Sequence, residues 1–327
     1  MSTKEELLIL LETQRGQMVS GADLAAQLGV TRAAVWKAAE ALRKEGMPIE
    51  SVSGSGYRLS PQSDVLSVQG IAAHLEDPHT PVKLYKDTDS TNTIAKQWAI
   101  EGAPHGSLVL AERQAQGRGR LGRSFASPPG GIYMSIVLRP QAGDGQAPPL
   151  ITAATAVAVC RAVRALCGIE LSIKWVNDLY LGTKKCCGIL SEASTNFEDG
   201  SIEYIVVGIG LNFRTRLREF PADIARIATS LYPHGTAPMP RVQLVSKIHS
   251  ELMAAFSSLH QKEFLPEYRG RSNILGKPIT VLAATPYPAT VVDIDDEARL
   301  LVQYGDEVFA LSSGEVSISP IQNGGIL

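Results

Sequence analysis

Three arginines and three glycines share one short stretch of the chain, residues 117–123, with the sequence Gly-Arg-Gly-Arg-Leu-Gly-Arg. Glycines let a backbone approach a ligand closely, and each guanidinium offers a planar fork of donors to a phosphate or carboxylate. The stretch therefore predicts an anion-binding loop. Because three neighbouring cations repel one another, we expect this loop to be disordered until an anion is bound.

The same stretch is not a dinucleotide-binding loop, although Gly117, Gly119 and Gly122 have the spacing of that fingerprint. Such a loop opens a helix whose N-terminus receives the pyrophosphate. Here residues 127–131 read Ser-Pro-Pro-Gly-Gly, which excludes a helix and leads into an apolar strand. For an arginine–glycine stretch alone, a solvated or RNA-binding surface loop remains an equal alternative.

A second polar stretch, residues 174–178 (Lys-Trp-Val-Asn-Asp), interrupts an apolar run and precedes a Gly-Thr turn that leads into Lys184 and Lys185. Lysines therefore lie on both arms of a predicted hairpin. A lysine ammonium can neutralise a carboxylate or phosphate, and an Asn-Asp pair can hold Mg²⁺ or a ribose. For Lys184, a solvated position at the hairpin end is an equal alternative.

With these motifs the sequence resembles the bifunctional biotin protein ligases, which also repress the biotin operon. The resemblance covers essentially the whole chain, and its motifs occur in a specific order at residues 89–92, 117–123 with 127–130, 174–178, 185–190, 208–212 and 228–231. Two positions depart from the family: Val176 stands where proline is usual and Phe125 where tryptophan is usual. Neither departure removes a reacting group.

The resemblance implies that biotin is adenylated with ATP and Mg²⁺ and is then transferred to a lysine of the biotin carboxyl carrier protein of acetyl-CoA carboxylase. It assigns catalysis to Lys185 and Arg120. The implied biotin contacts are Ser90, Thr91, Asn92, Gln114, Gly117, Arg118, Arg120, Lys185 and Gly188. The implied nucleotide contacts are Arg120, Arg123, Lys174, Asn177 and Asn212.

Three further residues of this region carry weaker expectations. Asp178 is the expected carboxylate near Mg²⁺, with a structural hydrogen bond as the alternative. Phe220 is a candidate to cover adenine. We expect Trp175 to be a core aromatic rather than a ligand contact.

The first sixty residues predict a DNA-binding unit. Helical segments at 5–12, 22–28 and 32–45 have helix-turn-helix spacing, and 49–53 with 57–59 predict a hairpin wing. Candidate DNA contacts are Arg32, Lys37, Arg43 and Lys44. Residues 1–63 contain seven basic and seven acidic side chains, so a helix-turn-helix that contacts only protein stays an alternative.

The pattern along the chain predicts an α+β multidomain protein. The expected division is a winged helix-turn-helix at 1–63, a central mixed α+β ligase domain resembling class II synthetases at 64–273, and a small SH3-like β-barrel at 274–327. Central strands are predicted at 82–85, 107–112, 132–138, 171–175, 189–193 and 204–211, and helices at 149–166 and 241–261. Short strands follow at 279–282, 289–294, 300–304, 307–310 and 315–318.

Composition narrows the possible functions. A net charge of −2 argues against a protein that binds nucleic acid through an overall positive charge. Any contact with operator DNA must therefore come from a local patch of basic residues. Four cysteines without paired metal spacing predict reduced core residues. We find no signal sequence and no apolar run long enough to span a bilayer, so we expect a cytoplasmic protein without membrane contact.

Two other functions remain open beside the ligase-repressor. A lipoate or octanoyl transferase would share the central fold, although the Gly-Arg-Gly-Arg loop disfavours it. A repressor that senses biotin without catalysis is disfavoured by Arg120, Lys174 and Lys185. For the ligase-repressor itself, the resemblance implies a homodimer when the adenylate is bound.

Overall fold

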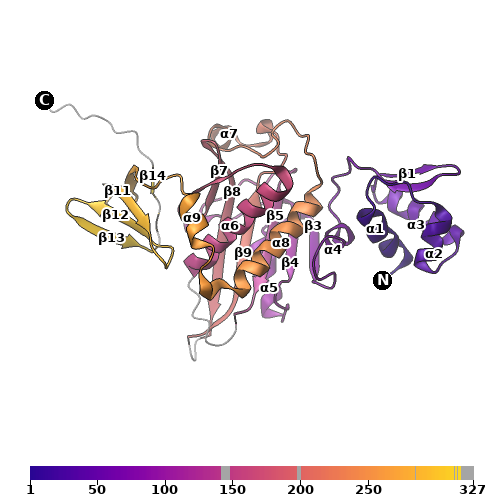
Figure 1. Ribbon diagram of the computed structural model, residues 1–327, viewed down its shortest axis with the longest axis horizontal. Helices are drawn as coiled ribbons and strands as arrows, with labels where there is room; N and C mark the ends of the chain where they lie inside the picture. Colours follow the sequence, from indigo (N-terminus) through magenta and orange to yellow (C-terminus); the bar gives the residue numbers. More distant parts are fainter. Residues whose placement is uncertain (141–147, 197–199, 284, 313, 315, 318–327) are drawn as a thin grey trace.

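The computed structural model describes residues 1–140, 148–196, 200–283, 285–312, 314 and 316–317. Figure 1 shows a helical unit at the N-terminal end, a central sheet covered by helices, and a small sheet at the C-terminal end. The predicted three-part α+β architecture is confirmed. The domain boundaries at 63/64 and 273/274 stay predictions.

The N-terminal unit contains α1 (Thr3–Thr13), α2 (Gly21–Leu28) and α3 (Arg32–Lys44), followed by the antiparallel pair β1 (Ile49–Val52) and β2 (Gly56–Leu59). The hydroxyls of Ser20 and Thr31 accept hydrogen bonds from the third residues of α2 and α3, and Gly29 ends α2 in a left-handed conformation. These caps set the tight turn between the two helices. The unit has its own apolar core, which includes Leu7, Leu11, Leu24, Val35, Leu42 and Leu59.

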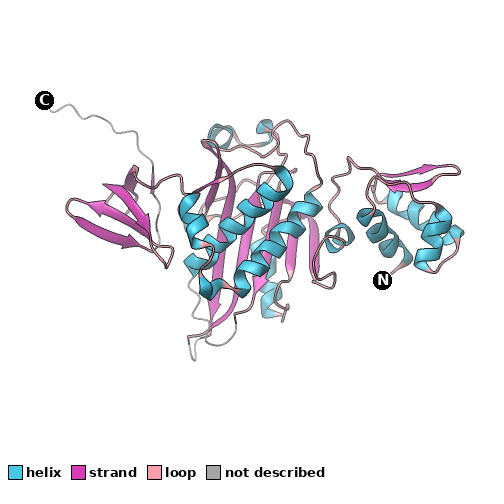
Figure 2. Cartoon of the chain, viewed as in Figure 1, coloured by secondary structure: helices cyan, strands magenta, loops and turns pink. Residues whose placement is uncertain are grey.

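The central sheet has seven strands in the order β3-β4-β5-β9-β8-β7-β6. Only β3 and β4 run parallel to each other, and the remaining neighbours are antiparallel. The strands are β3 (Val82–Thr88), β4 (Leu108–Gln114), β5 (Ile132–Leu138), β6 (Ser172–Lys174), β7 (Asp178–Leu181), β8 (Lys184–Thr195) and β9 (Ile202–Leu211). Figure 2 shows this mixed sheet behind two long helices.

Strands β4, β5 and β9 are mostly buried because helices cover both sides of the sheet. On β4, Leu108 and Leu110 belong to the core beneath α6 (Pro148–Cys167) and α8 (Arg241–Ser257). The intervening Val109 packs instead with Ala95 and Ala99 of α5 (Thr91–Ile100). Two-residue alternation thus divides the central core between the faces.

The expectation that no apolar run is long enough to span a bilayer is wrong for α6. The helix is 20 residues long, an 18-residue stretch of it has a mean hydropathy of 1.7, and by length and composition alone it could cross a membrane. However, 72% of that stretch is buried inside the protein. The run is apolar because α6 lies between the sheet and neighbouring helices.

Several short elements were absent from the predictions. These are α4 (Val68–Ala72), α7 (Ala222–Ile227), α9 (Leu265–Gly270) and the 3₁₀ segments Arg120–Gly122, Leu217–Glu219 and Leu259–Gln261. Each contains six residues or fewer, too few for a helical repeat to be recognised in the sequence.

The C-terminal sheet has the order β13-β12-β11-β10-β14 and is antiparallel throughout. Its strands are β10 (Pro278–Val281), β11 (Tyr287–Ile294), β12 (Leu300–Tyr304), β13 (Glu307–Leu311) and β14 (Val316–Ser317). Residues 315 and 318 of the predicted last strand lie outside the described residues. Ile279, Val291 and Leu300 join the same core cluster as the central helices, so this sheet is packed against the central region.

A buried arginine joins the first two regions. The guanidinium of Arg241, 4% exposed, pairs with Asp64 at 2.7 Å and with Glu112 of β4 at 2.8 Å. Asp64 lies in the joint after the helix-turn-helix and also pairs with Arg214 at 2.8 Å. Because both acidic partners lose water around Arg241, this cluster fixes the joint to the sheet.

The four cysteines are free thiols, as predicted. Cys160, Cys186 and Cys187 are buried, and burial raises the pKa of each thiol. They are inert core residues at neutral pH because a thiol must ionise to act as a nucleophile or metal ligand.

Candidate active site

A cleft of about 310 Å³ opens where β8 and β9 meet the N-terminus of α5, the arginine loop and the turn between β6 and β7. Most sequence-predicted residues come together here. The lining includes Ser90, Thr91, Asn92, Gln114, Arg118, Arg120, Arg123, Lys174, Asn177, Asp178, Lys185 and Gly188.

One end of the cleft is a chain of neutral polar groups. The Gln114 carbonyl accepts hydrogen bonds from the Thr91 backbone at 2.8 Å and the Thr91 hydroxyl at 3.1 Å. The Ser135 hydroxyl of β5 lies within hydrogen-bonding distance of the Thr91 hydroxyl, at 2.7 Å, and of the Asn92 side-chain oxygen, at 2.6 Å. These side chains are thus fixed before a ligand arrives, and they offer the donors and acceptors that an amide or ureido group needs.

Ser135 and Glu192 complete this polar end and were missed by the sequence analysis. Glu192 accepts from Asn92 at 2.9 Å and pairs with Lys96 at 2.5 Å. Burial raises the pKa of Glu192, but the bonds from Lys96 and Asn92 outweigh burial and hold it below 4.5. The carboxylate therefore stays ionised and orients Asn92.

Two glycines of β9 form the floor of the cleft. A Cβ on Gly208 would lie 2.1 Å from the Asn92 carbonyl oxygen, and one on Gly210 would lie 2.5 Å from the Phe125 ring. Neither space admits a side chain. The Gly-Ile-Gly motif thus lets Asn92 and Phe125 reach the floor.

The other end of the cleft is cationic. Five cationic residues line it: Arg118, Arg120 and Arg123 from the loop, and Lys174 and Lys185 from the hairpin. Arg120 donates to the Asn177 side chain at 3.3 Å, and Asn177 in turn donates to the Ile189 carbonyl at 2.9 Å. An anion entering here meets several guanidinium and ammonium groups together.

The arginine loop is described in one hairpin-like conformation, and the expectation that it is disordered until an anion binds stays a prediction. Gly119 donates to the Arg123 carbonyl at 2.8 Å, and Phe125 donates to the Gly117 carbonyl at 2.7 Å, which closes the loop as a small hairpin. Arg118 lies 3.7 Å from Glu192, so a carboxylate offsets part of the repulsion among the arginines.

Lys185 and Asp178 form an ion pair at 2.6 Å on neighbouring strands. Asp178 thus pairs with Lys185 of β8, which differs from the expected alternative of a hydrogen bond to the arginine loop, and its role near Mg²⁺ stays a prediction. Among the described residues, no group of three or more His, Cys, Asp and Glu side chains could hold a metal ion. A single carboxylate suffices for Mg²⁺ only where phosphates supply further oxygen ligands.

Three residues that were expected to contact biotin or the nucleotide do not line the cleft among the described residues: Gly117, Asn212 and Phe220. Gly117 begins the arginine loop beside its returning strand, where a Cβ would come 2.3 Å from the Phe125 backbone carbonyl oxygen. Asn212 is 4% exposed and ties the end of β9 to the next segment by donating to the Thr229 carbonyl at 3.0 Å. Phe220 is 7% exposed and is likewise absent from the lining among the described residues.

Trp175 is 4% exposed, as expected of a core aromatic, although its edge also reaches the cleft. The C-terminal region also lines the cleft, a contribution not predicted from the sequence. Its lining residues are Leu282, Gly314, Val316 and Ser317. No local pattern could have revealed this contribution, because it depends on how that region packs.

The DNA candidates lie on α3. Arg32, Lys37 and Lys44 are exposed. Arg43 is instead half-buried, pairs with Glu40 and donates to the Ile49 carbonyl at 2.7 Å. Arg43 therefore braces α3 against the wing, and three cations remain presented along the helix.

Comparisons with known proteins agree with both regions. A family described as "Biotin/lipoate A/B protein ligase family" matches residues 84–212, and a family described as "HTH domain" matches residues 3–58. The bifunctional ligase/repressor BirA of Bacillus spizizenii is 33% identical over 97% of this chain and 99% of its own length.

Two further similar proteins match a smaller part of this chain. The biotin–[acetyl-CoA-carboxylase] ligase of Mycobacterium tuberculosis is 30% identical over 79% of this chain and 97% of its own length. The biotin protein ligase from Aquifex aeolicus in complex with biotin and ATP superimposes with a TM-score of 0.63 at 28% identity, covering 72% of this chain and 97% of that one.

Proposed function

Because the chain belongs to the family of bifunctional biotin protein ligases and repressors, we propose that it converts biotin and ATP to biotinyl-5'-AMP and then biotinylates a carrier protein. The acceptor is a specific lysine of the biotin carboxyl carrier protein of acetyl-CoA carboxylase. One observation carries the proposal: a single cleft joins a fixed neutral polar end to a cationic end.

The first half-reaction joins two anions. A biotin carboxylate oxygen attacks the α-phosphorus of ATP, the bond to the bridging oxygen breaks, and pyrophosphate leaves. Thr91, Asn92 and Gln114 hold the ureido end of biotin, which directs its carboxylate toward Lys185. Lys185 and Arg120 then offset the charge that gathers on the phosphoryl oxygens, while the loop excludes water.

The second half-reaction needs no nucleophile from the enzyme. The amine of the acceptor lysine attacks the biotinyl carbonyl carbon, AMP leaves with the anhydride oxygen, and the amine loses a proton. In the first half-reaction, Mg²⁺ would neutralise charge on the leaving pyrophosphate, and Asp178 is our candidate carboxylate to hold it. Lys174, Asn177 and Arg123, which line the cleft, are our candidate nucleotide contacts.

The direct test is transfer of radiolabelled biotin to a purified carrier domain with ATP and Mg²⁺. We expect label on one lysine of that domain. Labelled lipoate is the control, because the matching family includes lipoate ligases. Transfer of lipoate in preference to biotin would overturn the substrate assignment, and binding of biotin without any transfer would leave only a sensor.

The helix-turn-helix gives the protein its second role. We propose that it represses biotin synthesis by binding operator DNA as a homodimer when biotinyl-5'-AMP fills the cleft. Arg32, Lys37 and Lys44 are the DNA contacts in this proposal. Residues 1–63 contain seven basic and seven acidic side chains, so one copy of the helix-turn-helix binds DNA weakly. Tight operator binding then needs two copies on symmetric half-sites. This role places the protein in the cytoplasm.

A further inference from the structure

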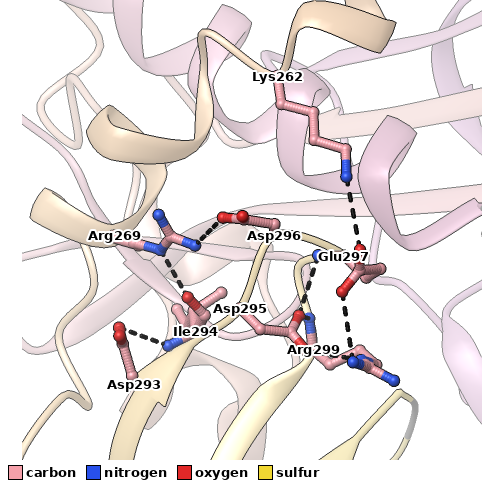
Figure 3. Close-up of polar contacts among 8 residues, drawn as sticks. All are labelled: Lys262, Arg269, Asp293, Ile294, Asp295, Asp296, Glu297 and Arg299. Atoms are coloured by element: carbon pink, nitrogen blue, oxygen red, sulfur yellow. Dashed lines mark hydrogen bonds and ion pairs between the residues drawn. The ribbon is translucent and has the colours of Figure 1, made fainter.

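The turn between β11 and β12 is wedged against the central region (Figure 3). Arg269 of α9 donates to the Ile294 carbonyl at 2.5 Å and pairs with Asp296 at 2.7 Å. Within the turn, Asp295 accepts from the backbone of Glu297 at 3.0 Å and pairs with Arg299 at 2.6 Å. These bonds give the turn one defined shape and one docking position.

The innermost residue of this turn is Ala298, which is 0% exposed and has a left-handed φ of 58°. Its carbonyl accepts a hydrogen bond of 2.9 Å from the indole nitrogen of Trp175. Trp175 stands between Lys174 and Asn177 in the turn that lines the cationic end of the cleft. A residue of the C-terminal sheet thus contacts the nucleotide side of the site through a single buried bond.

The opposite side of the same segment is also held. Tyr268 of α9 donates to the Val176 carbonyl at 2.9 Å, and Asn273 donates to the Ile173 carbonyl at 2.9 Å. On the cleft side, Asn177 holds Arg120. The segment is therefore held by α9, by the β11–β12 turn and by the arginine loop, and the Trp175 indole donates the hydrogen bond that joins it to the turn.

Building on the proposed function, we propose that Trp175 is a positioning residue for ATP. Its indole N–H, anchored on the Ala298 carbonyl, sets where Lys174 and Asn177 present their polar atoms to the nucleotide. If the bond is lost, the buried carbonyl has no partner, and the segment shifts until water or another donor reaches it. A displacement of about 1 Å is enough to weaken in-line attack considerably.

The test compares Trp175→Phe with wild type. Phenylalanine keeps an aromatic ring in the core but removes the N–H. We expect the KM for ATP to rise about tenfold in the adenylation half-reaction, which is what the loss of one buried hydrogen bond predicts. Biotin affinity should stay within about twofold, since the polar end is fixed by bonds to β4, β5 and β8 rather than to this turn.

Two further variants guard against a simple folding defect. Arg269→Ala releases the turn without touching the cleft and should raise the KM for ATP in the same direction. Lys262→Ala removes a looser pair, 3.5 Å from the exposed Glu297 of the same turn, and should leave it unchanged. If Trp175→Phe and Arg269→Ala both keep the wild-type KM, or if biotin and ATP binding weaken equally, the positioning role is overturned.

Direct binding of a fluorescent ATP analogue separates this inference from the proposed function. A wild-type protein that binds the analogue but does not adenylate biotin would refute the proposed function. Trp175→Phe would still test the inference there: about tenfold weaker binding supports it, and unchanged binding overturns it.

Discussion

Lys185 is the residue on which adenylation depends most in this account. Its ammonium lies 2.6 Å from Asp178 and lines the same cleft as the arginine loop. The carboxylate holds the ammonium in place until an anion enters. An exchange of Asp178 for a phosphoryl or biotinyl oxygen then places the cation where charge develops.

Lys185→Ala should therefore slow adenylation about 10²- to 10³-fold, the usual loss when one group that stabilises developing charge is removed. Transfer from supplied biotinyl-5'-AMP should fall far less, because no phosphoryl charge develops in that step. Single-turnover assays of the two half-reactions measure the difference. Matched losses in both would mean that Lys185 serves binding alone.

Arg120→Gly should separate making the adenylate from keeping it. Arg120 is held by Asn177 and points into the cationic end, where it can bind the adenylate phosphate. Removing it costs the bound intermediate about 1.5 to 3 kcal/mol, so biotinyl-5'-AMP should escape and label bystander lysines. The release rate measures this directly, and a mutant that retains the adenylate as well as wild type would contradict the role.

At the scale of elements, α5 is docked on the sheet through the polar end of the cleft. Its N-terminal residues Thr91 and Asn92 reach Gln114 of β4 and Ser135 of β5, and its Lys96 reaches Glu192 of β8. The position of the helix and the geometry of the biotin end are thus set by the same bonds. Loss of Glu192 should loosen both.

We expect Glu192→Gln to destabilise the free protein by about 1.5 kcal/mol at neutral pH, the value of hydrogen bonds to a charged group. Because the folded pKa of Glu192 lies below 4.5, its contribution is complete above that pH and is lost as the pH falls through the folded pKa. Denaturant unfolding of both proteins from pH 7 to pH 3 tests this. A stability difference that grows on acidification would contradict the assignment.

The elements that could be predicted are those whose signal is local. Composition and periodicity predict the long apolar strands and the helices α6 and α8. The capping residues Ser20 and Thr31 mark the starts of α2 and α3. α5 was missed, since its buried residues are two small alanines, Ala95 and Ala99, and the polar Thr91 and Asn92. Helices of one or two turns leave no periodicity to detect.

The residues of the candidate site likewise separate into those with a local signal and those without one. Sequence motifs predicted most of the lining residues, whereas Ser135 lies inside the continuous apolar run of β5 and has no such motif. Its role depends on α5 packing against that strand. Val316 and Leu282 reach the cleft only because the C-terminal sheet docks there, and a contact between segments so far apart leaves no trace in either one.

At the scale of the whole molecule, the cluster around Arg241 links the DNA-binding end to the ligase region. Arg241→Met leaves Asp64 and Glu112 with less charge compensation, so the free energy of unfolding should fall by about 3 to 5 kcal/mol. Arg214→Met is the matched control, because Arg214 also pairs with Asp64 but is 37% exposed. Its cost should stay below about 1 kcal/mol. Equal losses in denaturant unfolding would refute the central place of Arg241.

In the proposed function, one molecule, biotinyl-5'-AMP, is made in the cleft and also controls DNA binding by the N-terminal helix-turn-helix. The adenylate can tighten operator binding only as far as it favours the dimer over the monomer. Deleting residues 1–63 should abolish DNA binding while part of the adenylation activity survives.

The most direct measurement is the affinity for a palindromic biotin operator at one fixed salt concentration, with sedimentation of the same samples. Biotin plus ATP should tighten binding by about tenfold or more, within the usual range of allosteric coupling, and should raise the sedimentation coefficient. Biotin alone or ATP alone should do neither. Equal operator affinity with and without both ligands would contradict the claim.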